Sequence, residues 1–486
     1  MPNRLSEILK ELNVVSTKGT ADPVISFVEF DSRKAGEGSL FVAVKGTQTD
    51  GHRYIPSVFE AGCRAVICED MPEDIPEDAV CVQVDDSAGT LGMAASAFYG
   101  HPSRELKLVG VTGTNGKTTI ATLLYEITGL LGEKAGLFST VQNYIGDKEI
   151  PATHTTPDAV SLNRMMRQMA DEGCTYCFME VSSHSVHQKR IAGLEFAGGI
   201  FTNITHDHLD YHKTFKAYIE AKKGFFDGLG KEAFALINAD DRNGSVMVQN
   251  TKAKIYTYSV REMADFKGRI IESMFEGMQI NIDGKEVWTP FVGFFNAQNL
   301  LAVYGSAVLL GFDREDVLVE LSKLKPVSGR FETIRSEDGV TAIVDYAHTP
   351  DALKNVIETI NRIRSFDKQL ITVVGAGGDR DKAKRPVMAA EAVKGSSKVI
   401  LTSDNPRSED PELIIRDMME GVTFKERIKV LSITNREEAI RTACMVARPG
   451  DIILIAGKGH ETYQEVKGVR THFDDREIVR EIFAQK

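Results

Sequence analysis

The chain has 486 residues, 42% hydrophobic and 26% charged, a balance typical of soluble globular proteins. Its length predicts several domains of roughly 100–200 residues each. The formal net charge of −11 argues against nucleic acid as the main partner, because nucleic-acid phosphates bind to basic faces. Six cysteines do not form a disulfide framework in a chain of this size. No stretch approaches the ~18 apolar residues of a membrane span, so we expect a cytoplasmic protein without membrane insertion.

The N-terminal region combines a surface helix with short apolar runs. Apolar residues recur at helical spacing from Leu5 to Leu12 and alternate with charges, which is typical of a surface helix and not of a signal peptide. Short strands are predicted at 40–44, 65–68 and 79–82, and a helix at 91–98. The segment Tyr99–Ser103 contains Gly, Pro and Ser and predicts a linker. We therefore expect a small N-terminal α/β domain over residues 1–102.

Two further regions follow along the chain. The first opens with the apolar run Leu106–Thr112, a glycine-rich turn and a helix, and its later strands are predicted at 176–181, 199–202 and 233–237. The second alternates strands at 341–344, 369–374, 398–402 and 451–456 with helices such as 351–364 and 437–447. This alternation predicts a mostly parallel α/β sheet. We expect a central domain over 103–329 and a C-terminal domain over 330–486.

The glycine-rich turn Gly113–Thr119 predicts a phosphate-binding loop. It lies between an apolar strand and a helix, so its backbone N–H groups would face phosphate oxygens. Lys117 would reach the β- and γ-phosphates, and the Thr118 hydroxyl would bind Mg²⁺. The common pattern has a glycine at position 111, where this chain has Val111, so the loop is a variant. The loop predicts a nucleoside triphosphate but does not define the reaction.

Two polar clusters, Glu180–His184 and Asn203–Asp210, each follow an apolar strand. Ligands collect at the carboxyl ends of strands in open α/β sheets. Glu180 can join Thr118 in holding Mg²⁺ beside the γ-phosphate. In the second cluster the spacing leaves three candidate ligands for a further metal open, namely His206, Asp207 and His208. Oxygen ligands dominate and no cysteine is close in sequence, so zinc is disfavoured.

Three strands of the last region lead into charged turns at 375–381, 404–407 and 456–461. If these strands are parallel, the three turns lie at one edge of the sheet. Arginines, a lysine and carboxylates would then converge, which suits a zwitterionic ligand.

Together these motifs resemble those of the Mur ligases, the ATP-dependent ligases of peptidoglycan synthesis. The resemblance covers nearly the whole chain and rests on the segments Asp31–Arg33, Gly113–Thr119, Glu180–His184, Asp207–His212 and Asp404–Arg407. It implies three α/β domains: a small N-terminal one for the UDP part of the substrate, a central P-loop mononucleotide-binding one for ATP, and a C-terminal Rossmann-like one for the incoming amino acid. It also implies that a free amino acid is ligated to a peptide carboxylate through an acyl phosphate, with Mg²⁺ as cofactor.

The resemblance assigns contacts by position. Those for ATP are Gly113, Thr114, Asn115, Gly116, Lys117, Thr118, Thr119, Asn296, Asn299, Arg330 and Asp345. Those for the UDP-linked muramoyl-dipeptide are Ser32, Thr47, Gln48, Thr49, Thr155, Thr156, Ser182, Gln188 and Arg190. The family usually has an asparagine before the two threonines, where this chain has His154.

The resemblance further implies a lysine that CO₂ converts to a carbamate, and Ala221–Phe226 matches that motif with Lys222 in the modified position. The catalytic residues it implies are Lys117, Glu180, His208 and Lys222. The metal ligands it implies are Thr118, Glu180, His208 and the carbamylated Lys222.

The segment Asp404–Arg407 is similar to that of relatives that add meso-diaminopimelate. Arg407 would pair with the distal carboxylate that lysine lacks, which makes the choice between the two amino acids sharp. The contacts implied for this amino acid are Arg380, Asp404, Asn405, Pro406, Arg407, Gly457 and Glu461.

Several alternatives are open at this point. L-Lysine is the runner-up substrate, and folylpolyglutamate synthetase is a more distant relative that Ser32 and Asp404–Arg407 disfavour. Two alternatives come from other functional classes. One is a P-loop NTPase with a regulatory or binding role, and the other is a non-catalytic sugar-nucleotide-binding protein. The base for the attacking amine is open between His208 and His348. We expect small-molecule substrates, no nucleic acid, and a monomer.

Overall fold

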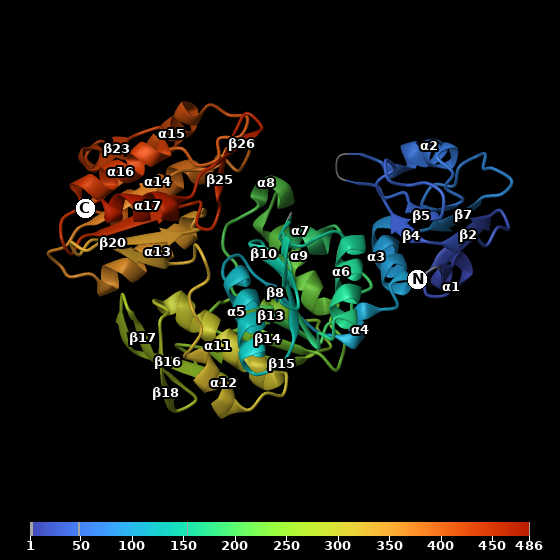
Figure 1. Ribbon diagram of the computed structural model, residues 1–486, viewed down its shortest axis with the longest axis horizontal. Coiled ribbons are helices and arrows are strands. Elements are labelled where there is room, and N and C mark those ends of the chain that lie inside the picture. Colours follow the sequence, from blue (N-terminus) through green and yellow to red (C-terminus); the bar gives the residue numbers. More distant parts are fainter. Residues whose placement is uncertain (1–2, 47–48, 153, 486) are drawn as a thin grey trace.

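The computed structural model describes residues 3–46, 49–152 and 154–485. They form a three-domain α/β protein whose large sheets have five, eleven and six strands. The N-terminal and C-terminal domains lie on opposite sides of the central domain (Figure 1). The fold expected from the sequence is therefore confirmed. The expected domain boundaries, after residues 102 and 329, fall between the large sheets and stay a prediction.

The N-terminal domain has a parallel core, β4 to β7, with β2 antiparallel at one edge in the order β2-β7-β6-β5-β4. Strands β5 and β6 are buried along their whole length, as expected for apolar strands covered on both faces. Its elements are β1 Asn3–Arg4, α1 Leu5–Leu9, β2 Val14–Lys18, β3 Val24–Ile25, β4 Phe27–Glu29, β5 Ser39–Val42, η1 Gly51–Tyr54, α2 Ile55–Glu60, β6 Ala65–Cys68, β7 Val80–Val84 and α3 Ser87–Phe98.

The predicted linker is only partly correct. Pro102 and Ser103 belong to a short helix, α4 (Pro102–Glu105), that follows a left-handed turn at His101. Proline is favoured in the first turn of a helix, because its fixed φ suits the helix and its missing N–H needs no partner there. The Pro-Ser pair therefore starts a helix where we expected a flexible connection.

The central sheet places β8 between β12 and β13, with which it pairs in parallel. Helices α5, α11 and α12 pack on one face and α6 and α9 on the other. Its elements are β8 Lys107–Thr112, α5 Lys117–Leu130, β9 Ala135–Phe138, β10 Gln142–Ile145, β11 Lys148–Pro151, α6 Ala159–Asp171, β12 Tyr176–Glu180, α7 Ser183–His187, β13 Gly198–Phe201, α8 Leu209–His212, α9 Phe215–Asp227, β14 Phe234–Asn238, α10 Gly244–Met247, β15 Lys254–Ser259, β16 Phe266–Met274, β17 Gly277–Ile282, β18 Lys285–Thr289, α11 Phe294–Leu309 and α12 Arg314–Leu321.

The C-terminal sheet has the order β19-β20-β24-β21-β22-β23, parallel except for β19. Helices α13, α14 and α15 cover one face, and α16 and α17 the other. Its elements are β19 Glu332–Arg335, β20 Thr341–Asp345, α13 Pro350–Ile363, β21 Leu370–Val374, α14 Lys384–Gly395, β22 Lys398–Leu401, α15 Pro411–Met419, η2 Glu426–Lys429, β23 Val430–Ser432, α16 Arg436–Val446, β24 Ile452–Ala456, β25 Tyr463–Val466, β26 Val469–His472 and α17 Asp475–Ala484.

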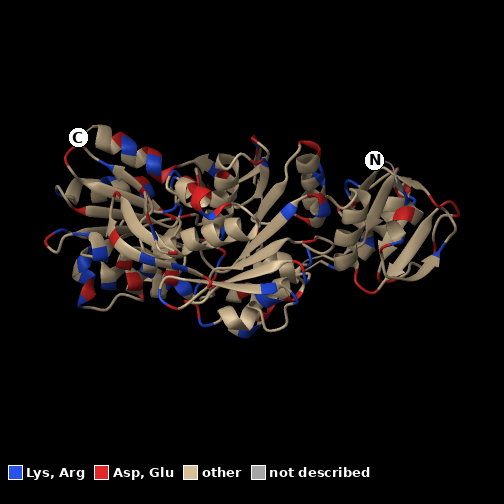
Figure 2. Cartoon of the chain, turned by 90° about the horizontal axis from the view of Figure 1, so that it is seen from below, with Lys and Arg blue, Asp and Glu red and all other residues tan. Residues whose placement is uncertain are grey.

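Charged residues of both signs are interspersed over all three domains (Figure 2). None of the helices in the described ranges combines the length and apolar character that crossing a membrane requires.

Candidate active site

One cleft, with a volume of about 1390 Å³, collects most of the predicted binding residues. The central and C-terminal domains both contribute to its walls. Predicted residues that line it are Thr114, Asn115, Gly116, Lys117, Thr118, Thr119, Thr155, Thr156, Glu180, Ser182, Arg190, His208, Lys222, Asn296, Asn299, Arg330, Asp345, Arg380, Asp404, Asn405, Arg407, Gly457 and Glu461. Predicted residues that do not line it are Ser32, Thr49, Gly113, Gln188 and Pro406. Thr47 and Gln48 lie outside the described residues.

The phosphate loop connects the buried strand β8 to helix α5. Its two glycines have positive φ, 149° at Gly113 and 91° at Gly116, which side chains other than hydrogen rarely allow. A Cβ atom at position 113 would collide with the Thr202 hydroxyl, and one at position 116 would lie 2.7 Å from Asn299 Oδ1. The Lys117 Nζ donates to the carbonyls of Gly113 (3.0 Å) and Thr114 (2.9 Å). The Lys117 ammonium group therefore binds the backbone of its own loop.

A second buried lysine lies beside this loop. The Lys222 side chain on α9 is 1% exposed, and its Nζ donates to the same Gly113 carbonyl at 2.7 Å. Burial lowers the pKa of Lys222 well below its ordinary value, and the neighbouring Lys117 charge lowers it further. Burial also lowers the pKa of Lys117. Two protonated amines at one acceptor would repel each other, so this part of the cleft favours a neutral Lys222 or a nearby anion.

The other predicted metal ligands lie at the ends of neighbouring strands. Glu180 ends β12, is buried, and accepts a hydrogen bond from the Thr140 N–H at 2.6 Å. The Thr118 hydroxyl accepts from the Arg330 guanidinium at 3.2 Å. His208 has a positive φ of 53°, and its Nε2 lies 3.4 Å from Asp207 Oδ2. Within the described residues, no three His, Cys, Asp or Glu side chains gather closely enough to hold a metal.

The structure separates the three candidates that the sequence left open. His206 has a side chain that is 61% exposed and lies 3.6 Å from Asp381. Asp207 and His208 both line the cleft, whereas His206 does not. Desolvation in the cleft lowers the pKa of His208, while Asp207 opposes the shift. Sequence reasoning therefore undervalued Asp207, a carboxylate among the cations of the cleft.

The residues expected to contact adenosine lie where α11 meets the C-terminal domain. Asn296 and Asn299 are buried on α11, and the Asn299 Nδ2 donates to Asn296 Oδ1 at 3.3 Å. Asp345 ends β20 and accepts from the Phe331 N–H at 2.7 Å. Burial raises the pKa of Asp345 to about 6, although Arg330 opposes the shift. The Arg330 guanidinium also stacks over the Tyr346 ring, 4.5 Å from its centroid.

Residues predicted for the UDP-linked substrate form one network beside Glu180. The Thr156 hydroxyl donates to the Glu180 carbonyl at 2.7 Å. Arg190 donates to the Thr156 carbonyl at 2.8 Å and, from two nitrogens, to Gln188 Oε1 at 3.0 and 2.7 Å. Gln188 therefore orients Arg190 without lining the cleft itself.

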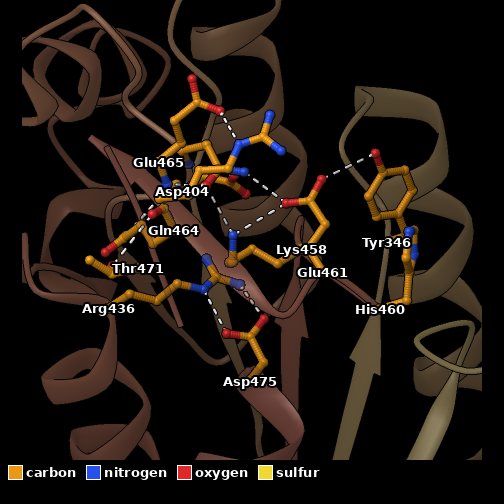
Figure 3. Close-up of polar contacts among 12 residues, drawn as sticks. Tyr346, Asp404, Arg436, Lys458, His460, Glu461, Gln464, Glu465, Thr471 and Asp475 are labelled. Atoms are coloured by element: carbon orange, nitrogen blue, oxygen red, sulfur yellow. Dashed lines mark hydrogen bonds and ion pairs between the residues drawn. The ribbon is translucent and has the colours of Figure 1, made fainter. Parts of the chain in front are cut away.

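The three charged turns of the C-terminal domain meet as expected, because β24, β21 and β22 are adjacent and parallel. The Asn405 Nδ2 donates to Glu461 Oε2 at 2.7 Å. Arg407 has a φ of 51°, and its guanidinium donates to the Gly378 carbonyl at 2.7 Å. The Lys458 Nζ lies between Asn405 and Glu461 (Figure 3).

The cleft also contains a lysine that the sequence did not single out and two histidines that it did. Lys384, at the start of α14, lines the cleft, and no pattern in the sequence distinguished it from a surface lysine. His348 also lines the cleft, and its Nδ1 donates to the Tyr346 carbonyl at 2.9 Å. Burial lowers the pKa of His348 to about 4. His154, which stands where the family usually has asparagine, lines the cleft as well.

Comparisons with known proteins agree with this architecture. Sequence models match residues 24–99 (Mur ligase family, catalytic domain), 111–307 (Mur ligase middle domain) and 329–459 (Mur ligase, glutamate ligase domain). The chain belongs to the Mur ligase family, and it is an ATP-dependent ligase.

Named relatives narrow the class. The chain is 59% identical over 481 residues to the UDP-N-acetylmuramoyl-L-alanyl-D-glutamate--2,6-diaminopimelate ligase of Bacteroides fragilis, with 99% of each chain covered. A solved structure of a ligase of this name is 34% identical, with a TM-score of 0.70 over 100% of this chain and 99% of that one. The MurF ligase from Thermotoga maritima in complex with ADP is 20% identical, with a TM-score of 0.62 over 94% and 97%, and shares the fold.

Proposed function

We propose that the protein adds meso-2,6-diaminopimelate to the D-glutamyl carboxylate of UDP-N-acetylmuramoyl-L-alanyl-D-glutamate, with ATP converted to ADP and phosphate. The main support is that one cleft contains both the phosphate loop and the segment Asp404–Arg407. Relatives with this substrate in their names are 56–59% identical over nearly the full length. The reaction belongs to the synthesis of the peptidoglycan precursor.

The chemistry proceeds in two steps. The D-glutamyl carboxylate attacks the γ-phosphorus of ATP, ADP leaves, and an acyl phosphate forms. The amine then attacks the acyl carbon, phosphate leaves, and the amine loses a proton. The Lys117 Nζ, which otherwise binds the carbonyls of its own loop, would exchange them for β- and γ-phosphate oxygens.

Thr118, Glu180, His208 and a carbamylated Lys222 are the residues that would hold Mg²⁺. When bound, Mg²⁺ would offset the negative charge of the γ-phosphoryl group. The unmodified side chains supply few oxygen ligands, because Lys222 carries only a donor group. A neutral amine reacts with CO₂, and burial of Lys222 favours that neutral form. The carbamate would add a carboxylate-like ligand and turn the repulsion between Lys222 and Lys117 into attraction.

The choice of amino acid depends on the turn at Asp404–Arg407. Arg407 would exchange its hydrogen bond with the Gly378 carbonyl for the distal carboxylate of diaminopimelate. L-Lysine has no such carboxylate and would leave the guanidinium without an anionic partner. A hydrogen bond to a charged group contributes about 1.5–3 kcal/mol, so diaminopimelate is favoured over lysine by roughly 10- to 100-fold.

One assay tests this proposal. Purified protein receives ATP, Mg²⁺ and the UDP-linked dipeptide, then diaminopimelate, L-lysine or no amino acid, and phosphate release is measured. We expect release that depends on diaminopimelate. Equal release without an amino acid would instead indicate an NTPase, and release with lysine alone would overturn the substrate assignment.

A further inference from the structure

The buried lysine of the amino-acid site, Lys458, has no role in the proposed chemistry so far. It lies in the turn after β24, between Gly457 and Glu461, and its side chain is fully buried. Its Nζ donates to Asn405 Oδ1 at 3.1 Å and to Glu461 Oε2 at 3.2 Å. The rings of Tyr463 and Phe473 lie near the same nitrogen, 5.5 and 6.0 Å from it. One ammonium group thus joins two side chains that line the cleft.

The backbone around Lys458 is held closely. Gly457 has a φ of 117°, and a Cβ there would lie 2.5 Å from Asp404 Oδ2. Gly459 has a φ of 54°, and a Cβ there would lie 2.7 Å from the Gly329 carbonyl oxygen. Neither position has room for a side chain, so the turn packs closely against Asp404 and Gly329 on either side of Lys458.

Lys458 and the Glu465 N–H together orient the Asn405 amide. Asn405 Oδ1 accepts from Lys458 and from the Glu465 N–H at 2.9 Å. Both partners are donors only, so the amide oxygen must face them. The Asn405 Nδ2 is therefore directed to Glu461, to which it donates at 2.7 Å.

Glu461 is the only carboxylate within salt-bridge distance of Lys458 in the described chain, and its side chain is 15% exposed. Its Oε2 accepts from Lys458 and Asn405, while its Oε1 lies 3.5 Å from the Tyr346 hydroxyl (Figure 3). Burial and the nearby Asp404 raise the pKa of Glu461, and Lys458 opposes that rise. Without this cation, Glu461 would be more readily protonated and would attract a substrate ammonium less strongly.

A neighbouring buried pair shows the contrast. The Arg436 guanidinium makes two hydrogen bonds to its own carboxylate, Asp475, at 2.8 and 2.7 Å, and both side chains are fully buried. That carboxylate is fully buried and bound to the arginine, so it is not available to a substrate. The partner of Lys458, Glu461, lines the cleft instead and can also contact a substrate. Because buried ion pairs often add little to stability, a functional role for this pair is a reasonable hypothesis.

We propose that Lys458 is a positioning residue for the amino-acid substrate, which holds Asn405 in one orientation and keeps Glu461 ready to bind an ammonium group. This inference rests on the proposed function and on the expectation that Glu461 contacts the incoming diamino acid. It predicts that Lys458 affects the binding of this substrate alone and acts through Glu461.

The test compares Lys458→Met with wild type and with Lys398→Met, an exposed lysine at the start of β22 in the same domain. For Lys458→Met we expect the KM for diaminopimelate to rise roughly 10- to 100-fold, the effect of losing a charged hydrogen bond. The KM values for ATP and for the UDP-linked dipeptide should stay within about twofold, and so should kcat. Lys398→Met should leave all these constants unchanged.

A double-mutant cycle shows whether Lys458 acts through Glu461. In a Glu461→Gln background, adding Lys458→Met should raise the KM by less than about threefold, because the carboxylate it supports is gone. Equal effects in both backgrounds, or a matching rise in the KM for ATP, would overturn the inference. Lys458→Gln serves as a second, milder variant. If circular dichroism shows that both Lys458 variants are unfolded, the residue stabilises the fold and the inference fails.

Different results would refute the proposed function and the inference about Lys458. A wild-type protein that releases phosphate without diaminopimelate would refute the ligase proposal itself. A diaminopimelate-dependent wild type with an unchanged KM in folded Lys458→Met would refute this inference alone.

Discussion

The neighbouring lysines Lys222 and Lys223 on α9 offer a matched test of the metal site. The Lys223 Nζ forms an i,i+4 ion pair with Asp227 at 2.7 Å, and such pairs contribute about 0.3–0.5 kcal/mol to stability. Lys222 is buried and faces the phosphate loop. Loss of one charge-stabilising group in a transition state raises the barrier by about 3–4 kcal/mol. We therefore expect Lys222→Ala to lower kcat by about 10²- to 10³-fold, and Lys223→Ala to leave it within about twofold.

The measurement is phosphate release with ATP, Mg²⁺, the UDP-linked dipeptide and saturating diaminopimelate. Urea denaturation of both variants separates an effect on activity from an effect on folding. Removal of bicarbonate and CO₂ should also lower the activity of wild type, and its addition should restore it. Equal activities of Lys222→Ala and Lys223→Ala would refute the assignment of Lys222 as a carbamylated ligand.

Three other predictions concern the C-terminal domain. Arg407→Met should raise the KM for diaminopimelate roughly 10- to 100-fold in steady-state assays, because a charged hydrogen bond is lost, and an equal rise for ATP would contradict it. Gly457→Ala should destabilise the protein by about 1–3 kcal/mol in urea denaturation, because φ is 117° and the new Cβ would lie 2.5 Å from Asp404 Oδ2; an unchanged midpoint would speak against this strain. Asp475→Ala should cost about 3–5 kcal/mol in the same experiment, because it leaves the buried Arg436 unpaired, and a loss under about 1 kcal/mol would show that the charge is relieved elsewhere.

The parts of the fold that sequence patterns predicted are those with strong local signals. The apolar runs at 65–68 and 451–456 correspond to β6 and β24, because fully buried parallel strands are continuously apolar. The hairpin block β16 to β18 was not predicted. The burial pattern of β16 is irregular, and its pairing with β17 shifts register between Ile270 and Glu272. Such strands are defined by their partners more than by their own sequence.

The candidate site was predictable where a residue lies in a distinctive local motif. Lys117 belongs to a glycine-rich turn with a recognisable spacing, so its place in this loop was predictable, whereas its hydrogen bonds to the loop carbonyls were not. Lys384 and Asp207 lack that advantage. Lys384 lies on a helix rich in charged residues, and only the tertiary fold turns it into the cleft. Asp207 lies in a run of consecutive polar residues after β13. The path of the backbone after this strand determines which of these side chains line the cleft, and the sequence does not show that path.

The net charge of −11 and the anionic substrates are compatible because affinity depends on the local field. Lys117 and Lys222 come from the central domain, and neither forms an ion pair with a carboxylate in the described part of the chain. Arg330, next to the C-terminal sheet, completes this group by donating to the Thr118 hydroxyl of the phosphate loop. Asn115 makes a second such link, to Asp351 on α13, at 3.3 Å. If ATP binds here as proposed, its phosphates would meet cations from both domains, and we expect ATP binding and the juxtaposition of the two domains to stabilise each other.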